Sequence, residues 1–177
     1  MKKLFIITVL ISIMFTYNCS YAAMTEEQYF SQIFNYMEQF VNSHKPQHVS
    51  YEYFPEFMDD SLNIYSVVYK NSKTSLIRNF YDNNFREKGA WPYFRTTDSA
   101  YSIGGIKVGS SIKPLSKSSI FYKNKGNKYS MDYEGTVMNF YYNKKGIITC
   151  IELIYYDEPF TSAAMDFING KVKANLK

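Results

Sequence analysis

Cysteine, histidine, tryptophan and proline are scarce in this chain of 177 residues, which holds 2 Cys, 2 His, 1 Trp and 5 Pro. Cys19 and Cys150 are too few for the disulfide framework that stabilises many small secreted folds. Pro46 separates His44 from His48, so the two histidines cannot share one helical face, and we expect no metal site. The sequence also lacks a recognisable set of catalytic residues. We therefore predict no catalytic residues and no cofactor, which favours a protein that is not an enzyme.

A large excess of charge is absent too, because 20 basic residues face 16 acidic ones, for a net charge of +4. Lys2 and Lys3 lie in an N-terminal segment that we expect to be removed, which leaves 18 basic and 16 acidic residues. Nucleic-acid binding needs clustered basic residues on one face. The charge balance therefore predicts no nucleic-acid partner.

Aromatic residues are abundant: they make up 19% of the chain, and 46% of all residues are hydrophobic. This composition is too apolar for a disordered chain and is typical of a globular protein. The chain contains no internal repeat and no Pro/Gly/Ser-rich linker. We expect a signal peptide at residues 1–22, followed by a single domain at residues 23–177.

The first 22 residues have the order of an export signal, with two lysines followed by an apolar run from Leu4 to Phe15. Small residues near Ala22 and Ala23 predict cleavage after one of these two alanines. An uncleaved anchor is the alternative, but the apolar run is shorter than the roughly 20 residues that span a bilayer. Lipidation of Cys19 is less favoured, because the residues before it lack the expected Leu and small side chains. We expect a periplasmic or secreted protein of a bacterial envelope, without a transmembrane segment in the mature chain.

Two terminal helices are indicated by their first residues. Thr25 and Gln28 form a capping-box pattern, and apolar residues then recur at three- and four-residue steps until about Ser43. Thr161 or Ser162 can cap a C-terminal helix that runs from Ala163 to about Lys173.

Strand patterns fill most of the region between these helices. Residues 62–69 predict a strand, and residues 75–81 predict a returning strand or a short helix. Residues 48–60 are interpreted as a connecting segment that can hold a short edge strand. Four strands at 120–123, 128–133, 136–142 and 147–156 are separated by turn residues and predict an antiparallel meander.

Together these elements predict an α+β fold: an antiparallel sheet, formed by the C-terminal meander of about four strands plus an N-terminal hairpin, with the N- and C-terminal helices packed on one face.

One pattern in the C-terminal half resembles a known group. Gly105-Ile106-Lys107-Val108-Gly109-Ser110-Ser111 leads into a short helix, and the hairpin at residues 136–152 follows through Asn143-Lys144-Lys145-Gly146. This order is similar to the SmpA/OmlA-like and β-lactamase-inhibitor-like small exported envelope proteins, although their usual Gly-x-Pro after the helix is absent here. The resemblance implies a non-enzymatic binding or assembly module.

Aromatic residues on neighbouring strands are the candidate binding residues, because tyrosine and tryptophan suit interfaces. They are Trp91, Tyr93, Tyr133, Tyr141 and Tyr155, and we expect Trp91 to Phe94 to lie beside an edge strand. These residues can equally be scaffold, since aromatics are good strand formers. Cys150 is expected to be a buried, unreactive thiol.

Two functions follow from these patterns. The first is an exported, non-catalytic module that contacts another envelope or secreted protein through an aromatic-rich sheet face or edge. The alternative is a small cell-wall hydrolase or glycan-binding protein that uses carboxylates of the 52–60 segment: Glu52, Glu56, Asp59 and Asp60.

Export of the full chain tests the signal-peptide prediction. We expect the mature protein to begin at Ala23 or Met24, because the small residues before these positions fit the signal-peptidase pocket. N-terminal sequencing and intact mass of the exported protein measure this. A protein that keeps residues 1–22, or that begins at a lipidated Cys19, would contradict the prediction.

Overall fold

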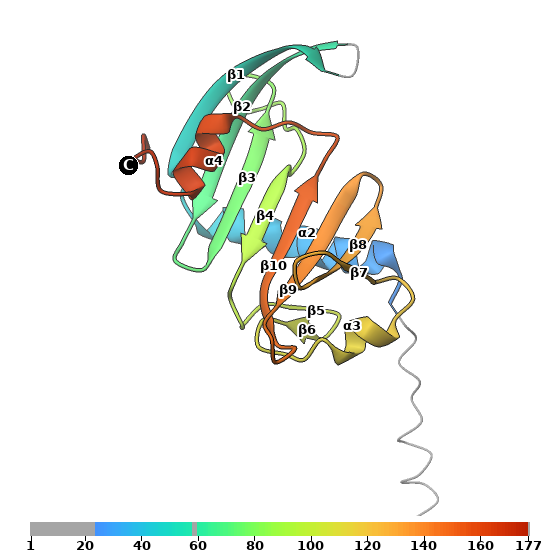
Figure 1. Cartoon of the computed structure of the whole chain (residues 1–177). Helices are drawn as coiled ribbons and strands as arrows, with labels where there is room; N and C mark the ends of the chain where they lie inside the picture. The colour runs from blue at the N-terminus through green and yellow to red at the C-terminus, as the bar shows by residue number, and fades with distance from the viewer. Residues whose placement is uncertain (1–23, 58–59, 177) are drawn as a thin grey trace, which may run out of the picture.

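The computed structural model describes residues 24–57 and 60–176 (Figure 1). Its main feature is one antiparallel sheet of eight strands in the order β1-β2-β3-β4-β10-β9-β8-β7. The strands are β1 (His48–Phe57), β2 (Asp60–Lys70), β3 (Thr74–Phe80), β4 (Tyr93–Thr96), β7 (Tyr122–Asn124), β8 (Lys128–Tyr133), β9 (Thr136–Tyr142) and β10 (Ile148–Tyr155). The predicted α+β class is confirmed. The predicted signal peptide and its cleavage residues Ala22 and Ala23 lie outside the described residues.

The chain builds the sheet from both edges toward the middle (Figure 1). After β4 it leaves the sheet through the small hairpin of β5 (Ser102–Ile103) and β6 (Ile106–Lys107) and the short helix α3 (Lys113–Lys117). It then enters the far edge at β7 and returns through three hairpins to β10, beside β4. The predicted meander and the predicted hairpin of β2 and β3 are both confirmed.

Helix α2 (Glu26–Ser43) begins at the predicted capping box. The Thr25 backbone amide donates to Gln28 Oε1 at 3.0 Å, and the Gln28 amide donates to Thr25 Oγ1 at 3.3 Å. Ile33 and Met37 on its apolar stripe are fully buried. They belong to one hydrophobic cluster with residues of the central strands. Burial of this stripe therefore fixes α2 on one face of the sheet.

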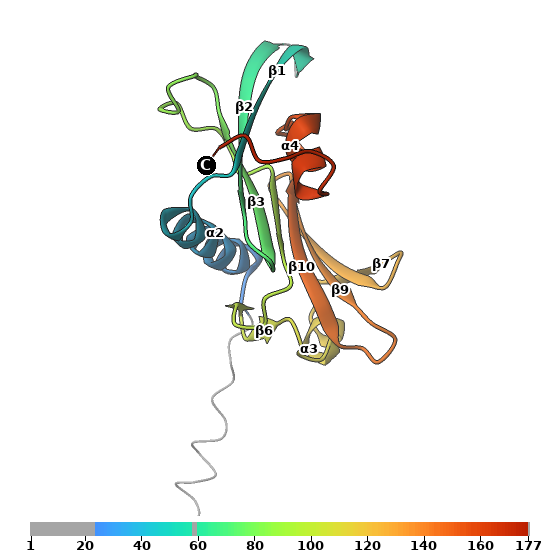
Figure 2. The ribbon, with the colours of Figure 1, turned by 90° about the vertical axis from the view of Figure 1, so that its left-hand side faces the viewer.

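Helix α4 (Ser162–Ile168) is capped at its N-terminus by Thr161, whose side chain accepts a hydrogen bond from the Ala164 amide. It packs on β1 and β2, where Phe167 joins a separate hydrophobic cluster with Val68 and Ile77. Figure 2 shows α2 and α4 on opposite sides of the sheet. The prediction that both helices share one face is wrong. Strands β2 and β3 carry buried apolar residues on both faces, so each face must be shielded from water by a packed helix.

Strand β1 is ten residues long and pairs with β2 from His48 to Phe57. The prediction of a connecting segment with only a short strand is therefore wrong. Glu52, Pro55 and Glu56 obscured the strand pattern. An edge strand tolerates proline and charged residues because one of its sides has no strand neighbour.

Strand β4 has only four residues and lies in the middle of the sheet, between β3 and β10. Phe94 is fully buried and lies opposite Leu76 on one side and Leu153 on the other. The expectation that Trp91 to Phe94 lie beside an edge is wrong. A four-residue strand is too short to show a clear alternation in the sequence.

No helix within residues 24–57 and 60–176 has the length and apolar character needed to cross a membrane.

Replacement of Phe94 tests the central position of β4. We expect Phe94→Ala to lower the free energy of unfolding by about 3–5 kcal/mol, because it removes a fully buried ring and leaves a cavity. Tyr53→Ala is the control: Tyr53 is 51% exposed, and its loss is expected to change stability by about 0.5 kcal/mol or less. Urea unfolding followed by circular dichroism measures both. Equal effects of the two substitutions would contradict the central position of β4.

Candidate functional site

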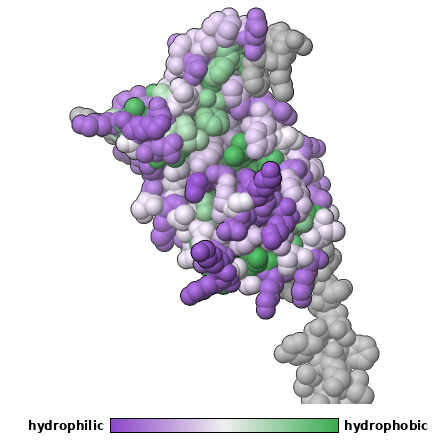
Figure 3. Space-filling model, viewed as in Figure 1, coloured by the Kyte–Doolittle hydropathy of each residue, from purple (hydrophilic) through white to green (hydrophobic). Residues whose placement is uncertain are grey.

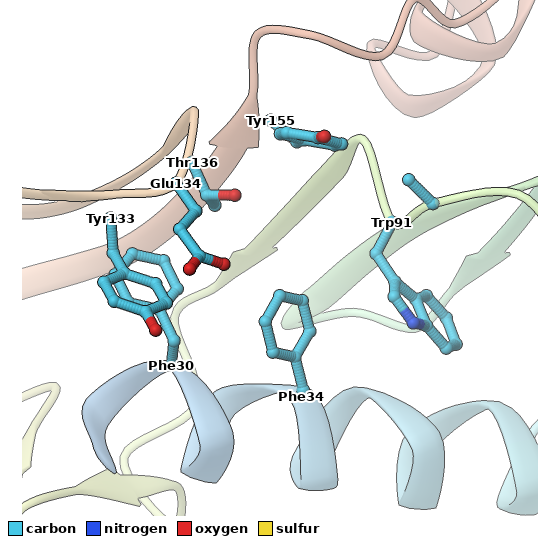
Figure 4. A pocket seen from close by; sticks show the side chains of 8 residues that line it. Phe30, Phe34, Trp91, Tyr133, Glu134, Thr136 and Tyr155 are labelled. Carbon is cyan, nitrogen blue, oxygen red and sulfur yellow. The ribbon is translucent and has the colours of Figure 1, made fainter. Parts of the chain in front are cut away.

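A pocket of about 230 Å³ opens between α2 and one end of the sheet (Figure 4). It lies where the turn between β8 and β9, the end of β10 and the segment before β4 meet the side of α2. We call it the aromatic pocket, and its lining residues are Phe30, Phe34, Ala90, Trp91, Tyr133, Glu134, Thr136 and Tyr155. Five of these eight side chains carry aromatic rings, and one carries a carboxylate.

Helix α2 forms one wall of the aromatic pocket. Phe30 and Phe34 are one helical turn apart, so both project from the same side of the helix (Figure 4). Phe30 stacks on Tyr133, with ring centres 5.4 Å apart and an angle of 27° between the planes. This stack connects α2 to the end of β8 and fixes that wall.

The turn between β8 and β9 supplies the carboxylate. Tyr133 pairs with Thr136, which leaves Glu134 and Gly135 as a two-residue turn with φ values of 45° and 74°. Asn, Asp or Gly is preferred in turns with two left-handed residues, since other side chains are strained there. A glutamate in this conformation costs about 1–3 kcal/mol. In Figure 4 its carboxylate lies between Phe34 and the stacked rings.

Trp91 and Tyr155 complete the opposite wall. The Tyr155 amide donates a hydrogen bond to the Pro92 carbonyl at 3.1 Å, which holds the end of β10 beside the start of β4. Arg78 Cζ lies 3.6 Å from the centre of the Trp91 ring, and Arg78 Nη1 lies 3.0 Å from Glu38 Oε1. One side of the indole is therefore covered by a cation whose charge is already paired.

The electrostatic character of the aromatic pocket is acidic. Burial raises the pKa of Tyr133, and the negative charges of Glu134 and Glu27 raise it further. Asp157 lies against Gly135, next to the same turn. Among the described residues, Glu134 takes part in none of the four ion pairs.

Three of the five predicted binding residues, Trp91, Tyr133 and Tyr155, line this one pocket. Tyr93 and Tyr141 do not, because they lie on the other face of the sheet. The sequence could not show this division, since it depends on which strands become neighbours and in which register.

Tyr93 and Tyr141 belong to a polar network around Glu152, which is 6% exposed. The Tyr141 hydroxyl donates to Glu152 Oε2 at 2.6 Å, and Arg95 Nη1 donates to Glu152 Oε1 at 3.4 Å. Burial and the negative charge of Glu152 together raise the pKa of Tyr93 to about 12. Because both oxygens of the buried Glu152 carboxylate have partners, its negative charge is compensated within the fold.

Figure 3 looks onto the face that carries this network and α4, and its lower half is largely hydrophilic.

A second hollow, a groove of about 350 Å³, lies outside the aromatic pocket. It is lined by Pro46, Val49, Val67, Tyr69, Phe80, Phe85 and Leu176. The C-terminal segment of the chain itself contributes Leu176 to this groove.

Cys150 lies beside the network and is buried, as predicted. Burial and the negative charge of Glu152 together raise the pKa of its thiol to about 11, although Arg95 opposes this shift. A nucleophilic cysteine needs a lowered pKa and access to solvent. This position therefore does not suit a catalytic thiol.

The described carboxylates of the 52–60 segment differ in their surroundings. Glu52 Oε2 accepts a hydrogen bond from the Ser162 amide at the start of α4, at 3.2 Å. Glu56 is exposed on β1, and Asp59 lies outside the described residues. Asp60 begins β2.

The two histidines lie apart: His44 stacks on Phe40 and His48 stacks on Phe167. No group of three or more His, Cys, Asp or Glu residues suited to a metal ion occurs within the described ranges.

Sequence reasoning missed Phe30, Phe34 and Glu134 as site residues. Phe30 and Phe34 belong to the apolar stripe of α2, which predicts core positions equally well. The sequence pattern places Glu134 only in a turn. Its identity was the available signal, because glutamate is unusual at a two-residue hairpin turn that prefers Asn, Asp or Gly.

No protein family, curated protein or solved structure matches this chain. The geometry of the aromatic pocket therefore carries the functional argument.

Thiol reactivity tests the buried state of Cys150 in the mature chain. We expect its reaction with a disulfide reagent at about pH 8 to be at least tenfold slower than that of a cysteine with the ordinary pKa of 9.0, because about a hundredfold less thiolate is present and the greater nucleophilicity of that thiolate recovers only part of the loss. Thr149→Cys combined with Cys150→Ser is the matched control, since Thr149 is the exposed neighbour. Similar rates at the two positions would show that Cys150 is accessible.

Proposed function

We propose that this protein is an exported, non-catalytic binding module of the bacterial envelope, and that it receives a projecting side chain of a protein partner in the aromatic pocket. The observation that carries the proposal is the convergence of Phe34, Trp91, Tyr133 and Tyr155 from four separate elements around one surface cavity. Aromatic pockets of this kind act as anchor points at protein interfaces, since a few buried contacts supply most of the binding energy.

The size of the pocket favours a side chain over a larger ligand. Drug-sized ligands and cofactors occupy about 300–1,000 Å³, whereas this pocket measures about 230 Å³. The walls are also held in place before binding, by the Phe30–Tyr133 stack and by the Arg78–Trp91 contact. Because the side chains of the walls are already fixed, less conformational entropy is lost when a ligand binds.

The chemistry of the described residues supports binding more than catalysis. Glu134 is the one residue with a carboxylate among the described residues that line the pocket. Glycoside hydrolysis needs two carboxyl groups on either side of the bond that breaks. A non-catalytic role also agrees with the resemblance of the C-terminal half to small exported envelope proteins.

Site-specific cross-linking tests this function. A photoreactive phenylalanine analogue in place of Phe34 is expected to capture one defined envelope protein, because Phe34 is half-buried in the wall of the pocket. The same analogue in place of Tyr122, which is 44% exposed on β7, is the control and is expected to capture none. The captured protein is then purified and titrated against variants.

We expect Tyr155→Ala to weaken the binding of that partner at least tenfold, as removal of an anchor-pocket ring does at other interfaces. Tyr122→Ala is expected to leave the dissociation constant unchanged. Cross-linking only from position 122, or an unchanged affinity in Tyr155→Ala, would contradict the proposal.

A further inference from the structure

The carboxylate of Glu134 is the feature of the aromatic pocket that a purely apolar anchor would not require. It lies among the rings of Phe34, Phe30 and Tyr133 and has no ion-pair partner among the described residues (Figure 4). A negative charge next to aromatic faces is favourable for one class of ligand, an organic cation, because both the carboxylate and the ring faces attract positive charge.

The local charge supports the same assignment. Glu134 and Glu27 both raise the pKa of Tyr133, which places their negative charges near the pocket. Asp157 adds another carboxylate beside the turn. The guanidinium group of Arg78, which stacks on Trp91, is already paired with Glu38. Glu134 therefore contributes a negative charge to the pocket that no ion pair among the described residues neutralises.

The backbone conformation of Glu134 also indicates a function for its side chain. Its φ of 45° is one that asparagine adopts more readily than glutamate. Residues that are held in a strained backbone conformation cluster at functional sites, so the side chain of Glu134 is a candidate for a function. The cavity and its rings place that function in ligand binding.

We infer that the aromatic pocket recognises an alkylammonium group, presented as a lysine side chain of the protein partner. This inference rests on the proposed function and adds the chemical class of the group that is bound. The aliphatic part of a lysine packs against Phe34 and Tyr155, while its ammonium group lies near Glu134 and the face of Tyr133. The volume of about 230 Å³ suits one such side chain.

Model ligands test the inference on the mature chain without knowledge of the partner. The probes are N-acetyl-lysine methylamide and its neutral counterpart N-acetyl-norleucine methylamide, which has the same aliphatic chain without the ammonium group. Trp91 is the one tryptophan of the sequence and lines the pocket, so its fluorescence reports occupancy directly. We expect the lysine probe to bind at least tenfold more tightly than the norleucine probe, and its binding to weaken at high salt.

Three variants separate charge from structure. Glu134→Gln keeps the size of the side chain and is expected to remove the preference for the lysine probe. Glu134→Asn is expected to remove it as well, but also to raise the melting temperature by about 2–4 °C, because asparagine relieves the strain of the turn. Glu56→Gln is the matched control, since it removes an exposed carboxylate on β1 that is outside the pocket.

A free amine is a second source of the same chemistry. A peptide source predicts that the lysine probe binds more tightly than butylammonium, because its amide groups contact the rim. A tighter fit of butylammonium would overturn the assignment to a partner lysine and indicate a free amine.

The inference and the proposed function can fail separately. Equal binding of the two amino-acid probes, or an unchanged preference in Glu134→Gln, would overturn recognition of ammonium and leave the pocket as a binding site. Binding of neither probe would also overturn the ammonium assignment. The proposed function itself fails if the cross-links from position 34 are absent or if Tyr155→Ala leaves the affinity for the captured partner unchanged.

Discussion

The pairing of β4 with β10 is the constraint on which the rest of the structure depends. It joins the strands built from the N-terminal half to those of the C-terminal meander, and it places Phe94 between Leu76 and Leu153 in the core. Just before the start of β4, the hydrogen bond from the Tyr155 amide to the Pro92 carbonyl continues the contact. A shift of one residue in this register would exchange the two faces of β4. The walls of the aromatic pocket are therefore set by the same pairing that closes the sheet.

The two faces of the sheet use their aromatic residues in different ways. On the face of α2, rings from the helix, the end of β8, the segment before β4 and the end of β10 surround a cavity that solvent can reach. On the face of α4, Tyr141 and Arg95 hold the buried carboxylate of Glu152. The first arrangement leaves the charge of Glu134 without an ion pair within the described chain, while the second satisfies its charge internally. The α2 face is therefore the one that presents both an open cavity and a carboxylate available to a ligand.

Local signals in the sequence were sufficient for some elements and not for others. The capping box at Thr25 and the turns of the meander predicted α2 and the strands β7 to β10, because these patterns involve residues close in the chain. Strand β1 was underestimated because Pro55 and its acidic neighbours interrupt the alternation, and β4 was too short to detect. The sides on which the helices pack depend on burial of both faces of β2 and β3, which no single segment reveals.

In the site, the type of residue was predicted for Trp91 and its tyrosine neighbours, but their grouping was not, because it arises from strand order. Glu134 looked like an ordinary turn residue until the φ angle and the cavity were known.

The central claim is that a cationic side chain enters the aromatic pocket, and NMR of the mature protein tests it most directly. Two-dimensional spectra of the backbone amides and aromatic rings, recorded with and without N-acetyl-lysine methylamide, show where the probe lies. The account predicts that the largest chemical-shift changes occur at Phe34, Trp91, Tyr133 and Glu134, and that they disappear in Glu134→Gln. Changes that gather instead around Tyr141 and Arg95 on the opposite face would contradict it.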